Sequence, residues 1–261
     1  MPDSKTTDDR YAMRPIDVEL YETCAKGTLA QVKALLDKGA DPNAVHWIES
    51  WVTQDRKEYC GDCDYPVIEA ATNADPRVLD LLLERGANPN VTDGYQQQPL
   101  AFAAGAERYE NVKRLLELGN DPNCVGVDGD TPCSWAANNR DTKVLELLFA
   151  HGADPNIGGI GDMALEHALM YGKPERIRFF VEHGCSPETC HETAINLASM
   201  ENARTLLECG FDPNTQTEDE NGNPCPIVDR LSEERRELFI RFGARSSRNT
   251  ELWNENQGYS R

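Results

Sequence analysis

Two cysteines at the C-x-x-C spacing, Cys60 and Cys63, are the main candidates for chemistry in this sequence. Two thiols at this spacing could bind a metal ion or cycle between dithiol and disulfide, and His46 lies nearby in the chain. A structural zinc site needs four ligands, however, and the sequence has no second C-x-x-C pair. Thioredoxin-like chemistry also needs a βαβ setting that this stretch does not supply. We therefore favour a spare pair of loop thiols and keep a metal-binding or redox protein as the alternative.

The other residues that could do chemistry form no recognisable site. His167, His183 and His191 have neither the spacing of metal ligands nor that of a catalytic triad. The glycine-rich stretch at 158–161 resembles a phosphate-binding loop only superficially, because the preceding strand and the Walker lysine are missing. We therefore expect a protein that is not an enzyme and that has no cofactor or metal site.

Most of the chain consists of imperfect copies of one unit, seen best in residues 131–156. Thr131 before Pro132 predicts the start of a first helix, because a hydroxyl and a proline suit the unpaired amine end. Apolar residues with i, i+3 and i+4 spacing in the stretch 144–148 predict a second helix. Gly152 suits a left-handed cap that ends this helix, and Pro155 prevents the helix from resuming.

The end of this unit occurs seven times along the chain. Its glycines are separated by 47, 33, 33, 32, 26 and 33 residues. These glycines are Gly39, Gly86, Gly119, Gly152, Gly184, Gly210 and Gly243.

The unit resembles the ankyrin repeat, which is about 33 residues long and opens with T-P-L-H-x-A. The opening survives in part at residues 65–70, 98–103, 131–136, 163–168 and 193–198. The resemblance covers about residues 17–245. It implies an all-α solenoid of stacked helix-turn-helix units with short hairpin-like finger loops. The D-P-N ending and the irregular units are similar to bacterial or viral ankyrin proteins, which include immunity proteins, effectors and inhibitors of defence enzymes.

The repeat pattern predicts how the chain is divided. We expect a mobile leader at residues 1–15, an array of about seven units with their caps at 16–245, and a polar tail at 246–261. The first interval is 14 residues too long, which places a finger insertion at about residues 46–62. The sixth unit is seven residues short, so we expect shortened helices near residues 198–203. In the third unit, the second helix is assigned to Val112, Leu115, Leu116 and Leu118. In the last unit, Ile227, Val228 and Leu231 are assigned to the first helix.

The composition limits the kinds of partner. The chain has 45 acidic and 26 basic side chains and a formal net charge of −19, which disfavours binding to nucleic acid or to an anionic membrane surface. Two explanations stay open: the acidity keeps the protein soluble, or an acidic face binds a basic partner. The first explanation is supported by the repeat endings, which themselves contain Asp41, Asp121, Asp154 and Asp212.

The number of cysteines indicates the redox state of the compartment in which the protein works. Nine cysteines are an odd number and are scattered over the repeats, which favours free thiols in a reducing compartment over a disulfide framework. No apolar run is long enough to span a membrane, and residues 1–15 do not have the pattern of a signal peptide. We therefore expect a cytoplasmic protein.

We predict a protein–protein interaction module that binds a basic protein partner and inhibits or scaffolds it, and that is a monomer when free. In ankyrin proteins the fingers and first helices commonly line the binding surface. By repeat position, the candidate partner-binding residues are Trp47, Trp51, Glu58, Tyr59, Asp64, Glu69, Tyr95, Asp128, Asp130, Trp135, Asp162 and Glu166. As alternatives, the two tryptophans fold back over the first repeat, or the acidic surface mimics nucleic acid.

Overall fold

The computed structural model describes residues 13–47, 50–52, 58–60, 63–158 and 164–246. The chain divides into two compact units, Met1–Ile157 and Gly158–Arg261, which are described separately below. Residues 1–12 of the predicted leader, most of the predicted insertion and residues 247–261 of the tail lie outside the described ranges.

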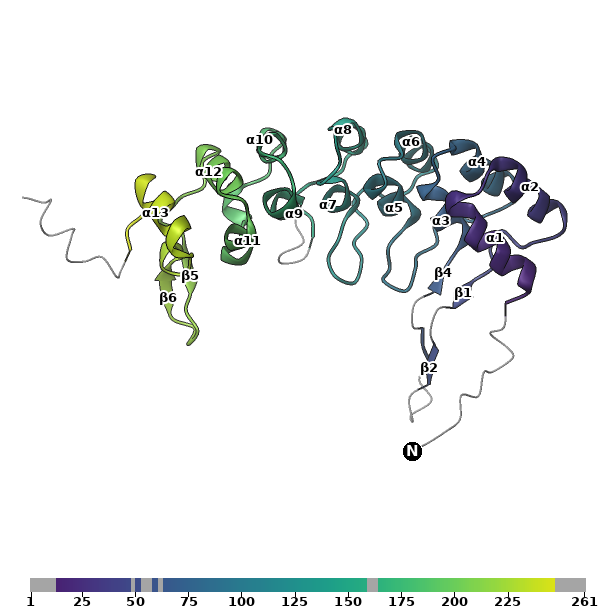
Figure 1. The fold of residues 1–261 in the computed structure, drawn as a ribbon, viewed down its shortest axis with the longest axis horizontal. Coiled ribbons are helices and arrows are strands. Elements are labelled where there is room, and N and C mark those ends of the chain that lie inside the picture. The colour runs from purple at the N-terminus through teal and green to yellow at the C-terminus, as the bar shows by residue number, and fades with distance from the viewer. Residues whose placement is uncertain (1–12, 48–49, 53–57, 61–62, 159–163, 247–261) are drawn as a thin grey trace, which may run out of the picture. The chain divides into compact units, whose positions relative to one another are not determined.

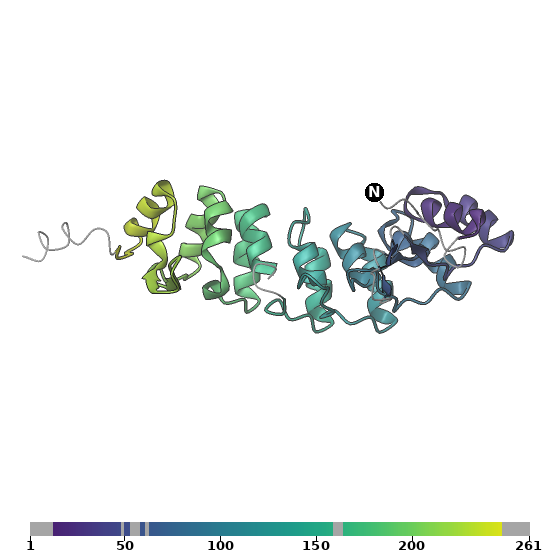
Figure 2. The same cartoon turned by 90° about the horizontal axis from the view of Figure 1, so that it is seen from below.

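The first unit is built from helix pairs that follow one another along the chain (Figure 1). The first helices α1, α3, α5 and α7 pack side by side in that order, and so do the second helices. Figure 1 shows the first helices beside the finger loops, and Figure 2 views the unit from the finger side. The pairs are α1 (Pro15–Lys26) with α2 (Leu29–Asp37), α3 (Pro66–Thr72) with α4 (Pro76–Glu84), α5 (Pro99–Gly105) with α6 (Tyr109–Glu117), and α7 (Pro132–Ala136) with α8 (Lys143–Ala150).

The second unit repeats this arrangement, and its last pair departs from it. Its elements are α9 (Ala164–Tyr171), α10 (Pro174–Glu182), the 3-10 turn η2 (Pro187–Thr189), α11 (Glu192–Leu197), α12 (Met200–Glu208), the 3-10 turn η3 (Ile227–Asp229) and α13 (Glu233–Arg241). The few strands form antiparallel hairpins within fingers. They pair β1 (His46–Trp47) with β4 (Cys63–Asp64), β2 (Ser50–Val52) with β3 (Glu58–Cys60), and β5 (Gln216–Glu218) with β6 (Pro224–Pro226). The predicted all-α solenoid of helix pairs is confirmed.

Local sequence signals account for the starts and ends of the helices. Thr131 and Ser134 cap α7 reciprocally, because the Ser134 amide donates to Thr131 Oγ1 (3.2 Å) and the Thr131 amide donates to Ser134 Oγ (2.9 Å). All seven glycines of the repeat endings have φ between +85° and +102°. A Cβ atom would meet nothing within 4 Å at any of them, so backbone conformation rather than space requires glycine there.

The D-P-N endings tie neighbouring repeats together. In the first of them, Asp41 Oδ1 accepts a hydrogen bond from the Asn43 amide (2.9 Å), and Asn43 Nδ2 donates to the Gly86 carbonyl of the next repeat (2.8 Å). Both bonds recur where Asn123 reaches Gly152 and where Asn214 reaches Gly243. The aspartates of these endings therefore have a structural role, which explains part of the net charge without a partner.

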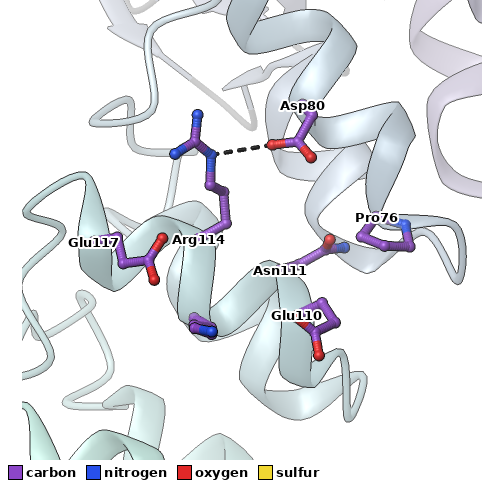
Figure 3. A pocket seen from close by; sticks show the side chains of 7 residues that line it. Pro76, Asp80, Glu110, Asn111, Arg114 and Glu117 are labelled. Atoms are coloured by element: carbon purple, nitrogen blue, oxygen red, sulfur yellow. Dashed lines mark hydrogen bonds and ion pairs between the residues drawn. The ribbon is translucent and has the colours of Figure 1, made fainter.

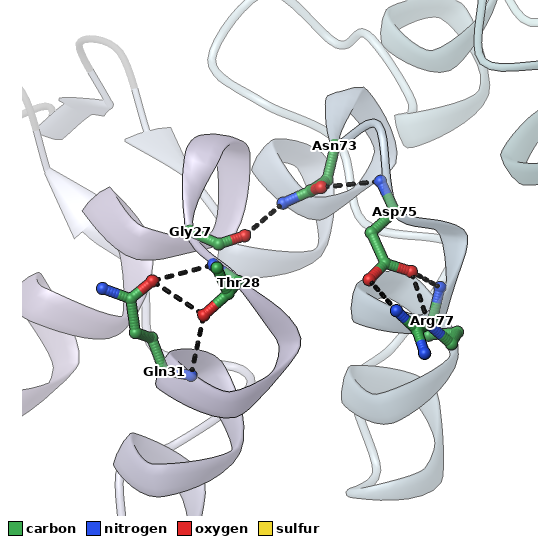
Figure 4. A network of polar contacts seen from close by, with 6 residues as sticks. All are labelled: Gly27, Thr28, Gln31, Asn73, Asp75 and Arg77. Atoms are coloured by element: carbon green, nitrogen blue, oxygen red, sulfur yellow. Dashed lines mark hydrogen bonds and ion pairs between the residues drawn. The ribbon is translucent and has the colours of Figure 1, made fainter.

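Buried asparagines make a second set of links between repeats that the sequence analysis did not anticipate. Asn73 Nδ2 donates to the carbonyl of Gly27 at the end of α1 (3.1 Å), and Asn73 Oδ1 accepts from the Asp75 amide (2.9 Å) (Figure 4). Asn73 Nδ2 also donates to the Cys24 carbonyl (2.7 Å). These bonds satisfy helix-end carbonyls that have no partner within their own helix. The same kind of bond, from Nδ2 to the first helix of the preceding pair, recurs at Asn111, Asn139 and Asn202.

Three details of the sequence interpretation are corrected. Leu118, assigned to the second helix of the third repeat, lies just past the end of α6 as its C-cap and is 38% exposed. In the sixth repeat α12 keeps nine residues, so the shortening falls on α11, which has six, and on the connection. In the last repeat the first helix is reduced to a 3-10 turn at Ile227–Asp229, because the preceding hairpin extends to Pro226.

Candidate functional site

The base of the first finger is a polar cluster around Tyr21, on α1. The Tyr21 hydroxyl lies 2.9 Å from Asp64 Oδ2 and 3.1 Å from Glu69 Oε1, so it can donate its proton to either carboxylate. The Tyr21 ring stacks on His46 with 4.2 Å between centroids and an angle of 6° between planes. In β1 and β4, His46 pairs directly with Asp64. The cluster therefore fixes the finger to the first helices of two repeats.

Two groups in this cluster have displaced pKa values. Burial raises the pKa of Asp64 to about 6, and the nearby Glu69 and Asp93 carboxylates act in the same direction. The hydrogen bonds from the Tyr65 amide and the Tyr21 hydroxyl oppose the increase without cancelling it. Burial and the two carboxylates that accept its hydrogen bonds, Asp64 and Glu69, raise the pKa of Tyr21, which keeps its proton and remains a donor.

The raised pKa of Asp64 predicts a pH dependence of stability. Because the folded protein holds this proton more tightly than the unfolded chain, Asp64 stabilises the fold below about pH 4, and the contribution is lost as pH rises through about 6. Between pH 4 and 7, we expect the unfolding free energy of wild type to fall relative to Asp64→Asn by about 1 kcal/mol, since solvent screens the half-buried group.

Urea denaturation at several pH values measures this difference. Asp128→Asn removes one exposed carboxylate and controls for the change in net charge. If the unfolding free energies of wild type and Asp64→Asn change with pH in parallel over the whole range, the pKa of Asp64 is not raised.

Neighbouring fingers of the first unit are joined by backbone hydrogen bonds. The Gly94 amide donates to the Cys63 carbonyl (2.9 Å), and the Val127 amide donates to the Tyr95 carbonyl (2.8 Å). Three apolar side chains are exposed on these fingers: Tyr95 (51%), Val125 (42%) and Val127 (60%). Asp128 is exposed beside them, and Asp130, at the base of its finger, is half-buried. The structure thus brings together Tyr95, Asp128 and Asp130 of the predicted residues.

The side chain at the fifth position of the repeat opening lies on a first helix, beside the fingers. This position is occupied by Glu69, Phe102 and Trp135 in three successive pairs of the first unit, and each side chain is half-buried. The rings of Phe102 and Trp135 lie 5.1 Å apart. Trp135 Nε1 is buried and has no hydrogen-bond partner within the described ranges. The Trp135 ring therefore packs against Phe102 of the preceding repeat.

Glu166 is not on the surface where the sequence analysis placed it. It occupies the fourth position of the opening, and the equivalent residues Ile68, Ala101 and Ser134 are buried as well. Comparison of the openings could have shown this, because His167 rather than Glu166 corresponds to Glu69. The Glu166 side chain is fully buried in the second unit.

Several predicted residues lie partly or wholly outside the described ranges. Trp51 pairs with Tyr59 and Val52 with Glu58 along the backbones of β2 and β3, while Trp47 ends β1. The side chains of Trp47, Trp51, Glu58 and Tyr59, and the whole of Asp162, are not described.

The thiol pair is only half described. Cys63 is half-buried in β4, whereas the Cys60 side chain lies outside the described ranges. In the described part of the chain, no group of three or more His, Cys, Asp or Glu side chains is arranged to hold a metal ion.

The pockets differ in size and position. A pocket of about 190 Å³ lies between α4 and α6, where Arg114 Nε is 3.0 Å from Asp80 Oδ1 (Figure 3). A larger pocket of about 800 Å³ lies in the second unit, where α9, α11 and β5 meet. The larger pocket is on the side of the first helices and contains Glu166.

Comparison with known proteins agrees with the helix pairs. No curated protein matches the chain. None of the helices in the described part of the chain has both the length and the apolar character needed to cross a membrane. Residues 67–159 match the family model of ankyrin repeats in three copies. Ankyrin repeats are general protein–protein interaction modules, built from stacked units that form extended binding surfaces. Residues 67–159 of the chain are therefore ankyrin repeats, and capped helix pairs of the same kind precede and follow them.

Proposed function

We propose that this ankyrin-repeat protein binds a basic protein partner through its fingers and first helices, and so inhibits or scaffolds that partner. The observation that carries the proposal is the surface formed by Tyr95, Val125, Val127 and Asp128, which we call the fingertip surface. It combines exposed apolar side chains with a carboxylate on fingers that hydrogen bonds hold in register.

This composition suits protein recognition. Exposed aromatic residues can act as buried anchors in an interface, because a tyrosine contributes a large, rigid contact area. Carboxylates at the rim attract a basic partner and speed its association, more strongly at low salt than at high salt. Asp64, Glu69 and Asp130 add negative charge at the bases of the fingers. We include Trp47 and Trp51 of the insertion as further anchors in the proposed surface.

We expect Tyr95→Ala to weaken binding of the partner by tenfold or more, which corresponds to about 1.4 kcal/mol. Tyr109→Ala is the matched control, because Tyr109 is also exposed (40%) but lies on the second helix α6. The full chain is immobilised, the partner is recovered from native cells and identified by mass spectrometry, and its affinity for each variant is measured. If Tyr109→Ala weakens binding as much as Tyr95→Ala, the fingertip surface is not the binding surface.

A further inference from the structure

The large pocket of the second unit contains a buried carboxylate with an unused oxygen. Glu166 is 0% exposed and lies on α9. Its Oε1 atom accepts from the His191 amide (2.6 Å) and contacts His191 Nδ1 (2.9 Å). Its Oε2 atom is buried and has no hydrogen-bond partner within the described ranges. A buried carboxylate that is only half satisfied is unfavourable, so a missing partner is expected here.

The other carboxylates of the pocket already have partners. Glu188 accepts from the Asp212 amide (2.6 Å) and from Thr215 Oγ1 (2.7 Å). Glu192 accepts from Arg230 Nε (3.2 Å) and Thr217 Oγ1 (3.3 Å). Of the three carboxylates, Glu166 is therefore the one with spare capacity for a donor.

The charges of the pocket favour a cation. Three glutamates line it, whereas the described lining includes no lysine or arginine. The His191 ring, which is half exposed, is the side chain in contact with Glu166. In the equivalent position, three repeats of the first unit carry Ile68, Ala101 and Ser134. A carboxylate is thus absent from this position in those three repeats.

We propose that the pocket binds an arginine side chain of the basic partner, with Glu166 as its anchor and His191 as a gate. The guanidinium displaces the His191 ring and donates to both oxygens of Glu166, while the His191 amide keeps its bond to Oε1. Arginine fits better than lysine, because its planar fork supplies two parallel donors to one carboxylate. Tyr171 lines the pocket and is 66% exposed, so its ring can cover the guanidinium face.

This inference rests on the proposed function, since it identifies the chemistry of the partner at one subsite. It can be tested without the partner itself. The probe is a short peptide whose one charged residue is a central arginine, compared with peptides that carry lysine or citrulline at that position. Citrulline keeps the shape of arginine and removes its charge. Binding to the full chain is measured by calorimetry, and the His191 ring signal is followed by NMR.

We expect the arginine peptide to bind at least tenfold more tightly than the citrulline peptide and to shift the His191 signal. Glu166→Gln should remove this preference. His191→Ala should strengthen arginine binding a few fold, because the competing ring is gone, whereas a purely structural contact would give no gain. Melting curves of both variants verify that they fold.

Equal binding of the three peptides to wild type would overturn the proposal even if Glu166→Gln failed to fold. An unchanged preference in folded Glu166→Gln, or weaker binding in His191→Ala, would also overturn it. If the native partner is captured equally well by wild type and Glu166→Gln, the pocket proposal fails while the fingertip surface stands. If no basic partner is captured at all, the proposed function fails, and the subsite proposal, which rests on it, fails with it.

Discussion

Leu115→Ala is expected to lower the free energy of unfolding by about 2–5 kcal/mol. Leu115 lies on α6, in the middle of the first unit, and is fully buried. Removing its side chain opens a cavity that the packed helices on both sides cannot close completely. In a repeat array each unit is stabilised by its neighbours, so a cavity in an inner repeat weakens both of its interfaces.

Leu118→Ala is the matched control, because it removes the same side chain from the exposed C-cap of the same helix. It should change the stability by less than about 0.5 kcal/mol. Urea denaturation followed by circular dichroism measures both variants. Equal losses from the two substitutions would show that the packing face of α6 is wrongly placed.

Asn73→Ala is expected to cost about 2–4 kcal/mol, a large effect for a polar substitution. It leaves the carbonyls of Cys24 and Gly27 and the amide of Asp75 without the side chain that bonds them. Each buried group that loses its partner costs about 1–3 kcal/mol. Since these bonds join α1 to the second repeat, the loss should loosen the first repeat selectively.

Hydrogen exchange of wild type and Asn73→Ala distinguishes this local effect from a global one. Amides of α1 and α2 should exchange faster in the variant, while those of α6 change little. Asn138→Ala, at an exposed asparagine in the same unit, is the control and should leave both regions unchanged. Unaltered exchange in α1 and α2 of Asn73→Ala would contradict the bridging role.

The parts of the fold that the sequence predicted are those governed by local conformation. The glycine endings depend on a positive φ at one residue, and Thr131 with Pro132 caps a helix through its nearest neighbours. Leu118 was misplaced because the apolar spacing continues past Glu117, the last residue of α6, although the Leu118 side chain at the C-cap is 38% exposed. The first helix of the last repeat was misassigned because the hairpin of the preceding finger extends to Pro226, and the Ile227 amide still donates to the Thr215 carbonyl across it.

The links between repeats were harder to predict because their partners are distant in the sequence. Asn73 bonds Cys24 from 49 positions away, and unequal repeat lengths hide its equivalence to the other asparagines. The burial of Glu166 was predictable, however, since Ile68, Ala101 and Ser134 share its place in the opening. The Tyr21 cluster depends on the path of a finger that lies outside the repeat pattern, so no repeat-based argument could assemble it.

The central claim, that partners bind on the finger side, is tested most directly by hydrogen exchange of the full chain with and without its recovered partner. We expect slower exchange on binding at residues 93–98 and 125–131, and at the first helices beside them. We expect little change in the second helices α4, α6 and α8. Protection confined to those second helices, with the fingers unaffected, would contradict it.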